Sequence, residues 1–313
     1  MGGLISVIVP NRDGADIISA CLRSVLAQTW PSVELIVVDD GSTDGSAALI
    51  AREFPTAKLV RLPAPVGFAG ACNAGLAAAS GDWIAILNSD AEAEPGWLAE
   101  AMAVAESAPE VAMIACRVLS ADGATVDSLG LRLTRGGLAF LRGRGAPDAA
   151  PPATEEVFGP AGSAALYRAS ALAAVGFFAP DFFAYYEDVD LAWRLRLAGY
   201  RCLLAHRAWV RHRHSHTAAR VGLDKRYYLQ RNRLRTVARN WPGWQILRNL
   251  HRLVAADLAS IALATVEGRP LSAIRARLDF LLSLPADLRG RRAAPAGIGD
   301  WLGRDSLPGG GQS

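Results

Sequence analysis

The feature that most constrains the fold is a repeated alternation of short apolar runs with segments of helical spacing in the N-terminal third. Strand-like runs occupy residues 5–10, 34–40, 58–62 and 83–87, and apolar residues three or four apart mark the segments between them. Several runs are continuous and β-branched, as in a sheet covered on both faces. Because strands that alternate with helices form parallel sheets, the sequence predicts an α/β protein with a mostly parallel, Rossmann-like sheet flanked by helices.

Composition divides the chain into an acidic body and a basic end. Of the 313 residues 51% are apolar, which is enough to form a large buried core. Residues 1–199 carry a formal net charge of −10 from 13 basic and 23 acidic residues, and residues 200–313 carry +13 from 20 and 7. The total of +3 gives no reason to expect nucleic-acid binding, whereas the basic end favours contact with an anionic surface.

The cysteines and the start of the chain indicate a cytoplasmic protein. The four cysteines include no CxxC pair, so neither a disulfide framework nor a Cys-ligated zinc site is expected. The N-terminus lacks the basic flank and long apolar stretch of a signal peptide. The longest mostly apolar run, 253–266, is shorter than the ~20 residues that cross a bilayer. We therefore expect a protein that lies at most on the inner face of the plasma membrane.

The last third of the chain is predicted to form basic amphipathic helices. We divide the chain at residue 220 into a first domain, 1–220, and a helical extension, 221–313, whose final PGGGQS is expected to be frayed. Basic and aromatic residues beside an apolar stripe suit an anionic membrane surface. Packing against the first domain explains the pattern as well. The expected lipid contacts include four neighbouring arginines: Arg231, Arg233, Arg235 and Arg239.

Three of the predicted strands end in polar clusters. These are Pro10-Asn11, Asp39-Asp40 and Asn88-Ser89-Asp90. Because ligands bind beyond the carboxyl ends of the strands in such sheets, the clusters predict one shared site. Neither GxGxxG after the first strand nor GxxxxGK[ST] occurs, which argues against dinucleotide-dependent dehydrogenases and P-loop NTPases. Carboxylates and amides suit ribose hydroxyls, a base edge and a divalent cation.

Five short segments follow one another in a fixed order: VIVP, VVDDGSTDG, GFAGACNAG, ILNSD and YYEDVDLAWRLRLAG. Together they resemble the family 2 glycosyltransferases with a GT-A fold. The similarity covers roughly residues 4–240 and is greatest to the bacterial rhamnosyltransferase-like branch. It implies a GT-A catalytic domain at 1–220. It also implies inverting transfer of a sugar, rhamnose in that branch, from a nucleoside-diphosphate sugar to a saccharide or lipid-linked acceptor in cell-envelope polysaccharide synthesis.

The resemblance places the nucleotide-sugar on residues of the first turns. Asp39 and Pro10 would contact the nucleotide base, and Asn73 would lie beneath the nucleotide at the start of a helix. The segment DDGSTDGS is also rich in residues that favour turns and cap helices, so a purely structural role for Asp39 stays open.

The family's metal site maps onto the NSD turn. Asp90 occupies the DxD position that holds Mg²⁺ or Mn²⁺ against the donor's two phosphates, and His212, aligned through AWVRH, would join it. Asn88 stands in place of the first Asp and offers the donor only a neutral amide oxygen. A solvated strand end is the alternative for the histidine.

An acidic cluster precedes the predicted helix 191–197. Carboxylates at a helix N-terminus are kept ionised by the helix dipole, and inverting transfer needs a base for the acceptor hydroxyl. The resemblance gives that role to Asp188, and it places Gly162, Glu187 and Asp190 on the acceptor side. Helix capping by the acids is the structural alternative.

A second class of function stays open at this point. The amide of Asn88 at a metal position would also suit a catalytically inactive protein that binds nucleotide-sugars or acts as a membrane scaffold. Retention of Asp90, Asp188 and His212 favours activity. A processive synthase is disfavoured, because QRNRL matches the QxxRW of those enzymes only faintly and no spanning helix is predicted.

Overall fold

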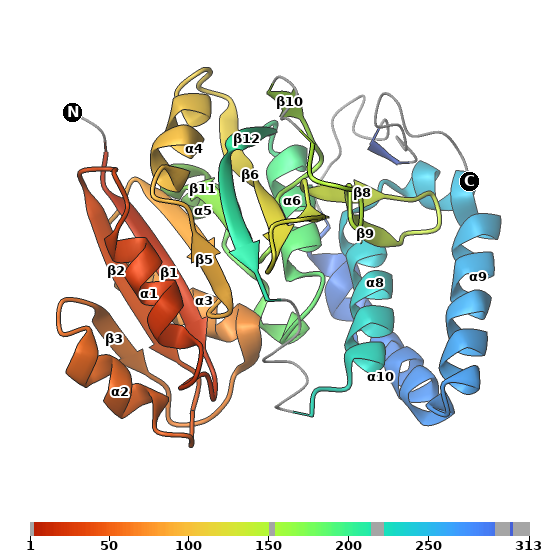
Figure 1. Cartoon of the computed structure of the whole chain (residues 1–313). Helices are drawn as coiled ribbons and strands as arrows, with labels where there is room; N and C mark the ends of the chain where they lie inside the picture. The colour runs from red at the N-terminus through yellow and green to blue at the C-terminus, as the bar shows by residue number, and fades with distance from the viewer. Residues whose placement is uncertain (1–2, 150–153, 214–221, 292–300, 303–313) are drawn as a thin grey trace.

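The computed structural model describes residues 3–149, 154–213, 222–291 and 301–302. Its centre is a ten-stranded sheet (Figure 1). Eight strands follow the order β10-β12-β6-β11-β4-β1-β2-β3, and in addition β5 pairs with β12 and β7 pairs with β6. β4, β1, β2 and β3 run parallel, and β6 and β12 form a second parallel pair. β11 lies antiparallel between these two groups. The predicted mostly parallel α/β sheet is therefore confirmed.

The bounds of the elements agree closely with the alternation in the sequence. The strands are β1 (Ile5–Asn11), β2 (Val33–Asp39), β3 (Lys58–Arg61), β4 (Trp83–Leu87), β5 (Ala91–Ala93), β6 (Val111–Ser120), β7 (Val126–Ser128), β8 (Leu131–Leu133), β9 (Ala139–Leu141), β10 (Glu155–Glu156), β11 (Ala164–Arg168) and β12 (Arg201–His212). The helices are α1 (Ile18–Leu26), α2 (Ser46–Glu53), α3 (Gly67–Ala78), α4 (Trp97–Ala105), α5 (Ala169–Val175), η1 (Pro180–Phe182), α6 (Glu187–Leu197), α8 (Lys225–Asn240), α9 (Gly243–Val266) and α10 (Pro270–Arg289).

Helices cover both faces of the sheet. Side chains alternate along β1, so Val7 and Val9 pack on one face with α1, α2 and α4, and Ile8 packs on the other with α3, α5 and α6. Burial on both faces explains why the central strands read as continuous apolar runs. The carboxyl ends of the parallel strands are left as the open edge of this three-layer arrangement.

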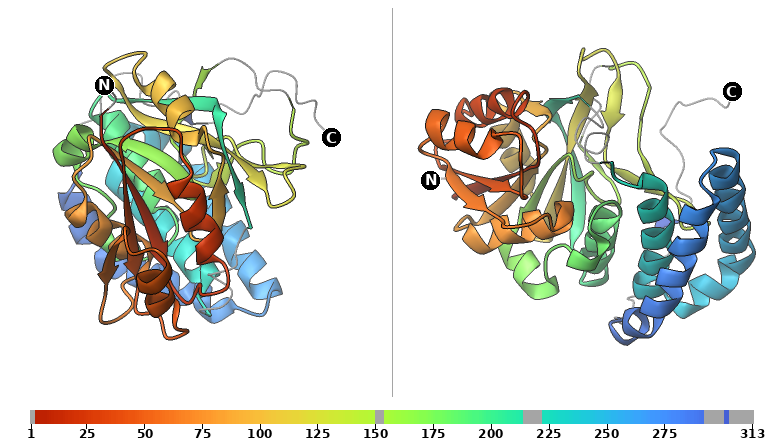
Figure 2. Two further views of the ribbon diagram at one scale, coloured as in Figure 1. Left: turned by 60° about the vertical axis from the view of Figure 1, so that its left-hand side comes forward. Right: turned by 90° about the horizontal axis from the view of Figure 1, so that it is seen from below.

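Three helices follow the sheet. α8, α9 and α10 lie on the side of the molecule away from β1–β3 (Figure 2). α8 contacts α6 and packs extensively against α10. Within the described residues, no helix is both long enough and apolar enough to span a bilayer. The proposed domain boundary at residue 220 and the C-terminal PGGGQS lie outside the described residues.

Candidate active site

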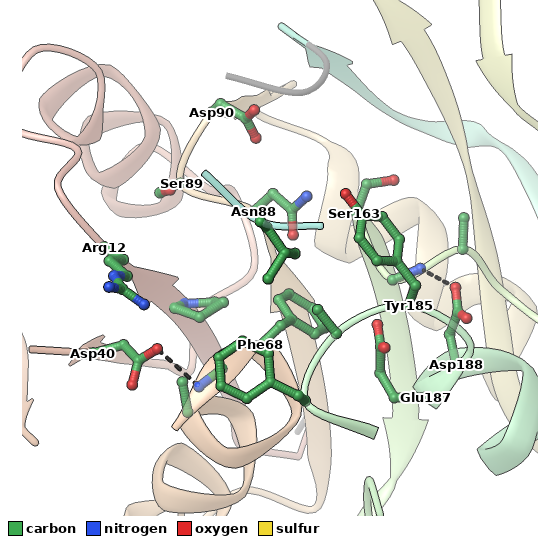
Figure 3. A pocket seen from close by; sticks show the side chains of 18 of the residues that line it. Arg12, Asp40, Phe68, Asn88, Ser89, Asp90, Ser163, Tyr185, Glu187 and Asp188 are labelled. Atoms are coloured by element: carbon green, nitrogen blue, oxygen red, sulfur yellow. Dashed lines mark hydrogen bonds between the residues drawn. The ribbon is translucent and has the colours of Figure 1, made fainter. Parts of the chain in front are cut away.

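A cavity of about 290 Å³ opens at the carboxyl edge of the sheet. Seven of the ten residues predicted from the sequence line it: Pro10, Asn88, Asp90, Gly162, Glu187, Asp188 and His212. Figure 3 shows Asn88 and Asp90 toward one end and Glu187 and Asp188 toward the other. The structure therefore brings the predicted donor, metal and acceptor residues around one space.

One end of the cavity is built on His212. This last residue of β12 is buried, and its two ring nitrogens face two carboxylates: Nε2 lies 3.1 Å from Asp90 Oδ1, and Nδ1 lies 2.9 Å from Asp127 Oδ2. Burial alone would disfavour the charged imidazole, but the hydrogen bonds and negative charge of Asp127 and Asp90 prevail and raise the pKa of His212 to about 9. Asp127 thus orients the ring so that Nε2 points at Asp90.

These residues have the chemistry of a divalent-cation site. The amide nitrogen of Asn88 lies 3.3 Å from His212 Nε2, while its buried Oδ1 has no hydrogen-bond partner within the part of the chain that the structure describes. An orphaned amide oxygen beside a carboxylate and an imidazole offers ligands that Mg²⁺ or Mn²⁺ accepts when phosphates and water complete the shell. No group of three or more His, Cys, Asp or Glu side chains is arranged as a ready metal cage in the part of the chain described. The donor set therefore fits a cation held jointly with a substrate.

The opposite end carries two adjacent carboxyl groups at the start of α6. Asp188 accepts hydrogen bonds from the backbone N–H of Gly162 at 3.0 Å and of Val189 at 2.8 Å. Burial raises the pKa of Asp188 above its ordinary value, although these hydrogen bonds oppose the shift. Burial and the charge of Asp188 raise the pKa of Glu187 much further, and Glu187 Oε2 has no hydrogen-bond partner among the described residues. Of the pair, Glu187 therefore holds its proton more tightly than Asp188.

The nucleotide side of the cavity differs in one position from the sequence prediction. Asp40 lines the cavity and accepts hydrogen bonds from the backbone N–H of Val66 at 2.7 Å and of Gly67 at 3.0 Å. These hydrogen bonds cap the first turn of α3 at Gly67. Asp39 does not line the cavity; it is buried behind the wall, 3.5 Å from the amide of Asn11.

Two other predicted residues hold the scaffold and do not line the cavity. The amide of Asn73 donates to the Phe178 carbonyl at 2.8 Å, which ties α3 to the segment before η1. Asp190 is buried and bonds Arg194 and Asn240, each at 2.8 Å, which joins α6 to α8. Among the described residues, Asn73 Oδ1 has no hydrogen-bond partner.

A loop of unusual backbone conformation forms one wall. Phe183, Tyr185 and Tyr186 all have left-handed φ angles, of 65°, 68° and 70°. Such angles are costly for residues with a Cβ, so the loop needs outside support. Asn232, fully buried in α8, supplies it through an amide that donates to the carbonyls of Phe182, Ala184 and Tyr185. α8 therefore fixes the loop that brings Tyr185 to the cavity.

The arginines of α8 are not lipid contacts, so that expectation is wrong. Arg233 and Arg235 are buried. Arg235 and Arg239 pair with Asp181 and Asp287, Arg233 pairs with Asp257, and Arg231 donates to backbone carbonyls of η1. Their positive charge is used inside the protein to join α8 to its neighbours.

Some cavity residues carry no sequence signal that identifies them. Asp127 lies in the short β7, and only the fold shows that it meets His212. Lys225 comes from the start of α8, beyond the segments that the strand-end rule or the family motifs select. Arg12 lies directly after the first strand, so its position could have been found from the same rule that selected Pro10.

Comparison with known proteins identifies the class. Residues 6–176 match the model of the family described as Glycosyl transferase family 2, and the chain belongs to that family. It is 28% identical over 222 residues to an N-acetylglucosaminyl-diphospho-decaprenol L-rhamnosyltransferase of Mycobacterium tuberculosis, covering 64% of this chain and 72% of that one. It is 38% identical over 121 residues to the succinoglycan biosynthesis protein ExoO of Rhizobium meliloti, covering 38% and 35%. The chain thus spans only about a third of the length of relatives such as ExoO.

Solved structures agree on the fold. TarS of S. aureus in complex with UDP-GlcNAc superposes with a TM-score of 0.61 at 18% identity, covering 91% of this chain and 82% of that one. A Pyrobaculum calidifontis mannosyltransferase in complex with GDP-Man and Mn²⁺ gives 0.54 at 19% identity, covering 93% and 86%. The protein is a glycosyltransferase of the GT-A fold.

Proposed function

We propose that this glycosyltransferase inverts the anomeric centre as it moves a sugar, rhamnose, from a nucleoside-diphosphate donor to a saccharide or lipid-linked acceptor in cell-envelope polysaccharide synthesis. One observation carries most weight: Asp188 is fixed by two backbone N–H groups in the same cavity as Asp90 and His212. A base and a diphosphate site on one cavity are what a direct displacement requires. The rhamnosyltransferase relative supports the choice of sugar and of a lipid-linked acceptor.

Asp188 acts on the acceptor. Its carboxylate takes the proton of the acceptor hydroxyl while that oxygen forms a bond to the anomeric carbon. The bond from the anomeric carbon to the diphosphate oxygen breaks on the opposite face, and the electron pair leaves with the nucleoside diphosphate. Glu187 forms a hydrogen bond with a sugar hydroxyl, with Gly162 leaving room beside it.

The donor lies between the first turns and the metal end. Pro10, with Asp39 and Asn73 behind it, forms the nucleotide side, and Asn88 faces the donor phosphates. Asp90 and His212 would hold Mg²⁺ or Mn²⁺, which offsets the charge of the leaving diphosphate when bound. Mn²⁺ in the complexes of two structural neighbours supports this choice of ion.

The place of action follows from the acceptor. A lipid-linked acceptor lies in a membrane, so we place the enzyme at the inner face of the plasma membrane, in contact with anionic lipid. The strongly basic end of the chain supports this placement.

A donor panel tests the proposal. The full chain is incubated with Mg²⁺ or Mn²⁺, with UDP-, GDP- and dTDP-sugars, and with a lipid-linked acceptor extract, and nucleotide release and the anomeric configuration of the product are measured. We expect metal-dependent release with one donor and an inverted product. Donor binding without release under all conditions would instead show an inactive binding protein.

A further inference from the structure

The last two helices turn their apolar side chains outward. Among the described residues, thirteen of the sixteen exposed large apolar side chains belong to α9 and α10. Most recur at three- and four-residue spacing, so each helix carries an outer stripe. The members are Trp244, Leu247, Leu250, Val254, Leu258, Leu263 and Val266 in α9, and Leu271, Ile274, Leu278, Leu281, Leu282 and Leu288 in α10.

The inner faces of the same helices are polar. Gln245 and Asn249 are two of the three buried residues of the 24 in α9. Asp257, on the inner side of α9, pairs with Arg233 of α8 and at 2.8 Å with Arg277 of α10. Asp287 of α10 is buried against the arginines of α8. Charged groups therefore join the three helices, together with the small buried side chains of Ala264, Ala273 and Ala276.

This arrangement reverses the usual pattern of a helix at a protein surface in water. There the apolar stripe faces the core, because removing a leucine side chain from water stabilises the fold by about 1.5–3 kcal/mol. In α9 and α10, thirteen large apolar side chains stay exposed and do not add this stabilisation, while charged groups are buried. The outer stripes of α9 and α10 are consequently a surface built to be covered by something apolar.

The charges around the stripes select what covers them. The exposed basic residues of the two helices are Arg248, Arg252, Arg275 and Arg289. The acidic residues are turned inward or paired: Asp257 and Asp287 with buried arginines, Asp279 with Arg275, and Glu267 with Arg226. A second copy of the chain would bring like charges together. An apolar surface rimmed by cations matches the boundary between anionic headgroups and acyl chains.

We propose that α9 and α10 lie in the plane of an anionic bilayer, with their outer stripes in the acyl boundary and their arginines among the headgroups. This rests on the proposed action at a membrane and names the surface responsible. Figure 1 shows α9 at the edge of the molecule opposite β2 and α2, with the sheet to one side of it. The helices thus dock the enzyme without contributing to the chemistry.

Vesicle binding of the full chain tests the surface without any substrate. Flotation is measured with phosphatidylcholine vesicles and with vesicles that also contain phosphatidylglycerol, at low and high salt. We expect binding to the anionic vesicles. Leu258→Glu and Leu278→Glu, both at exposed positions, should each weaken binding about tenfold or more, whereas Leu26→Glu, at an equally exposed site on α1, should not. Arg248→Gln with Arg252→Gln should reduce both the binding and its salt sensitivity.

Two results would overturn this assignment. One is failure of the native chain to float with anionic vesicles at low salt. The other is a concentration-dependent dimer, seen by light scattering, that Leu258→Glu dissociates, since a second copy would then be the occupant. Nucleotide binding and turnover on a soluble acceptor analogue should be unchanged in Leu258→Glu. If the wild-type chain showed no turnover on the soluble acceptor analogue, this would count against the proposed function, but the result of the vesicle-binding experiment would still hold.

Discussion

Two buried aspartates, one at the sheet edge and one in the helical part, show how differently this chain uses negative charge. Asp188 accepts only backbone N–H groups and faces a cavity, whereas Asp287 lies between Arg235 and Arg239 with Ser283 as a further donor. Among the described residues the first carboxylate pairs with no cation, which suits a group that takes a proton. The second is fully compensated and holds helices together. The sheet edge is organised for chemistry, and the helices for support and docking.

The sharpest test of this contrast is Asp287→Ala. Removal of the carboxylate leaves Arg235 and Arg239 without their buried partner, so the free energy of unfolding should fall by about 3–5 kcal/mol. Denaturant unfolding followed by circular dichroism measures this. Asp279→Ala, at a half-exposed position of the same helix, is the control and should cost much less. Equal losses would mean that the buried network does not hold the helices.

At the sheet edge the expected loss is of rate. Asp188→Asn should lower transfer by ~10²-fold or more with nucleotide binding retained, because the base is gone but the shape is kept. Glu187→Gln is the matched control: burial and the charge of Asp188 raise the pKa of Glu187 well above its ordinary value, so an amide should replace this carboxyl at little cost, and the rate should stay within about tenfold. Steady-state kinetics of both variants measure these two rates. The reverse ranking would move the base to Glu187.

The pH dependence of catalysis should distinguish the sheet edge from the helical part of the molecule. Burial raises the pKa of Asp188, so the base becomes protonated as the pH falls through this raised value. Below it, kcat/KM for the acceptor should decline about tenfold per pH unit, and this limb should lie above the ordinary aspartate value of ~3.9. The limb should be absent in Asp188→Asn. Vesicle binding should show no such limb.

Sequence reasoning succeeded where a local pattern determines the outcome. The strand runs and their polar ends predicted the sheet and placed Pro10, Asn88 and Asp90 at its edge, because β-branched runs and strand-end turns are local signals. The other four predicted cavity residues, Gly162, Glu187, Asp188 and His212, came from the family resemblance. Sequence reasoning could not distinguish Asp39 from Asp40, since neighbouring carboxylates look alike before the cap on Val66 is seen. It failed also for the α8 arginines, whose aspartate partners lie up to 58 residues away in sequence. The sequence also did not show that the apolar stripe of α9 faces outward, because this depends on the distant partners of its polar side chains.

Asn232 links the two regions and should show an intermediate effect. Asn232→Asp keeps the size of the side chain but replaces the donating amide, so the three carbonyls of the left-handed loop lose their common donor. We expect kcat/KM for the acceptor to fall about tenfold, with nucleotide affinity unchanged, because Tyr185 is displaced. Asn249→Asp, a buried amide of α9 away from the loop, serves as control. A uniform loss of nucleotide and acceptor binding would indicate general destabilisation instead.

The smallest expected change is at the metal end, where Asn88→Asp would restore two acids to the NSD turn. An added charged oxygen ligand should leave metal-dependent nucleotide binding intact or strengthen it by less than about tenfold, since phosphates supply most of the hard ligands. Asp90→Ala removes the carboxylate that faces His212 and should abolish the metal dependence. Calorimetry with nucleotide, with and without Mn²⁺, distinguishes the two variants. If Asp90→Ala bound nucleotide and metal like the wild type, the cation would lie elsewhere, and the sheet edge would lose the feature that makes its charges a reaction site.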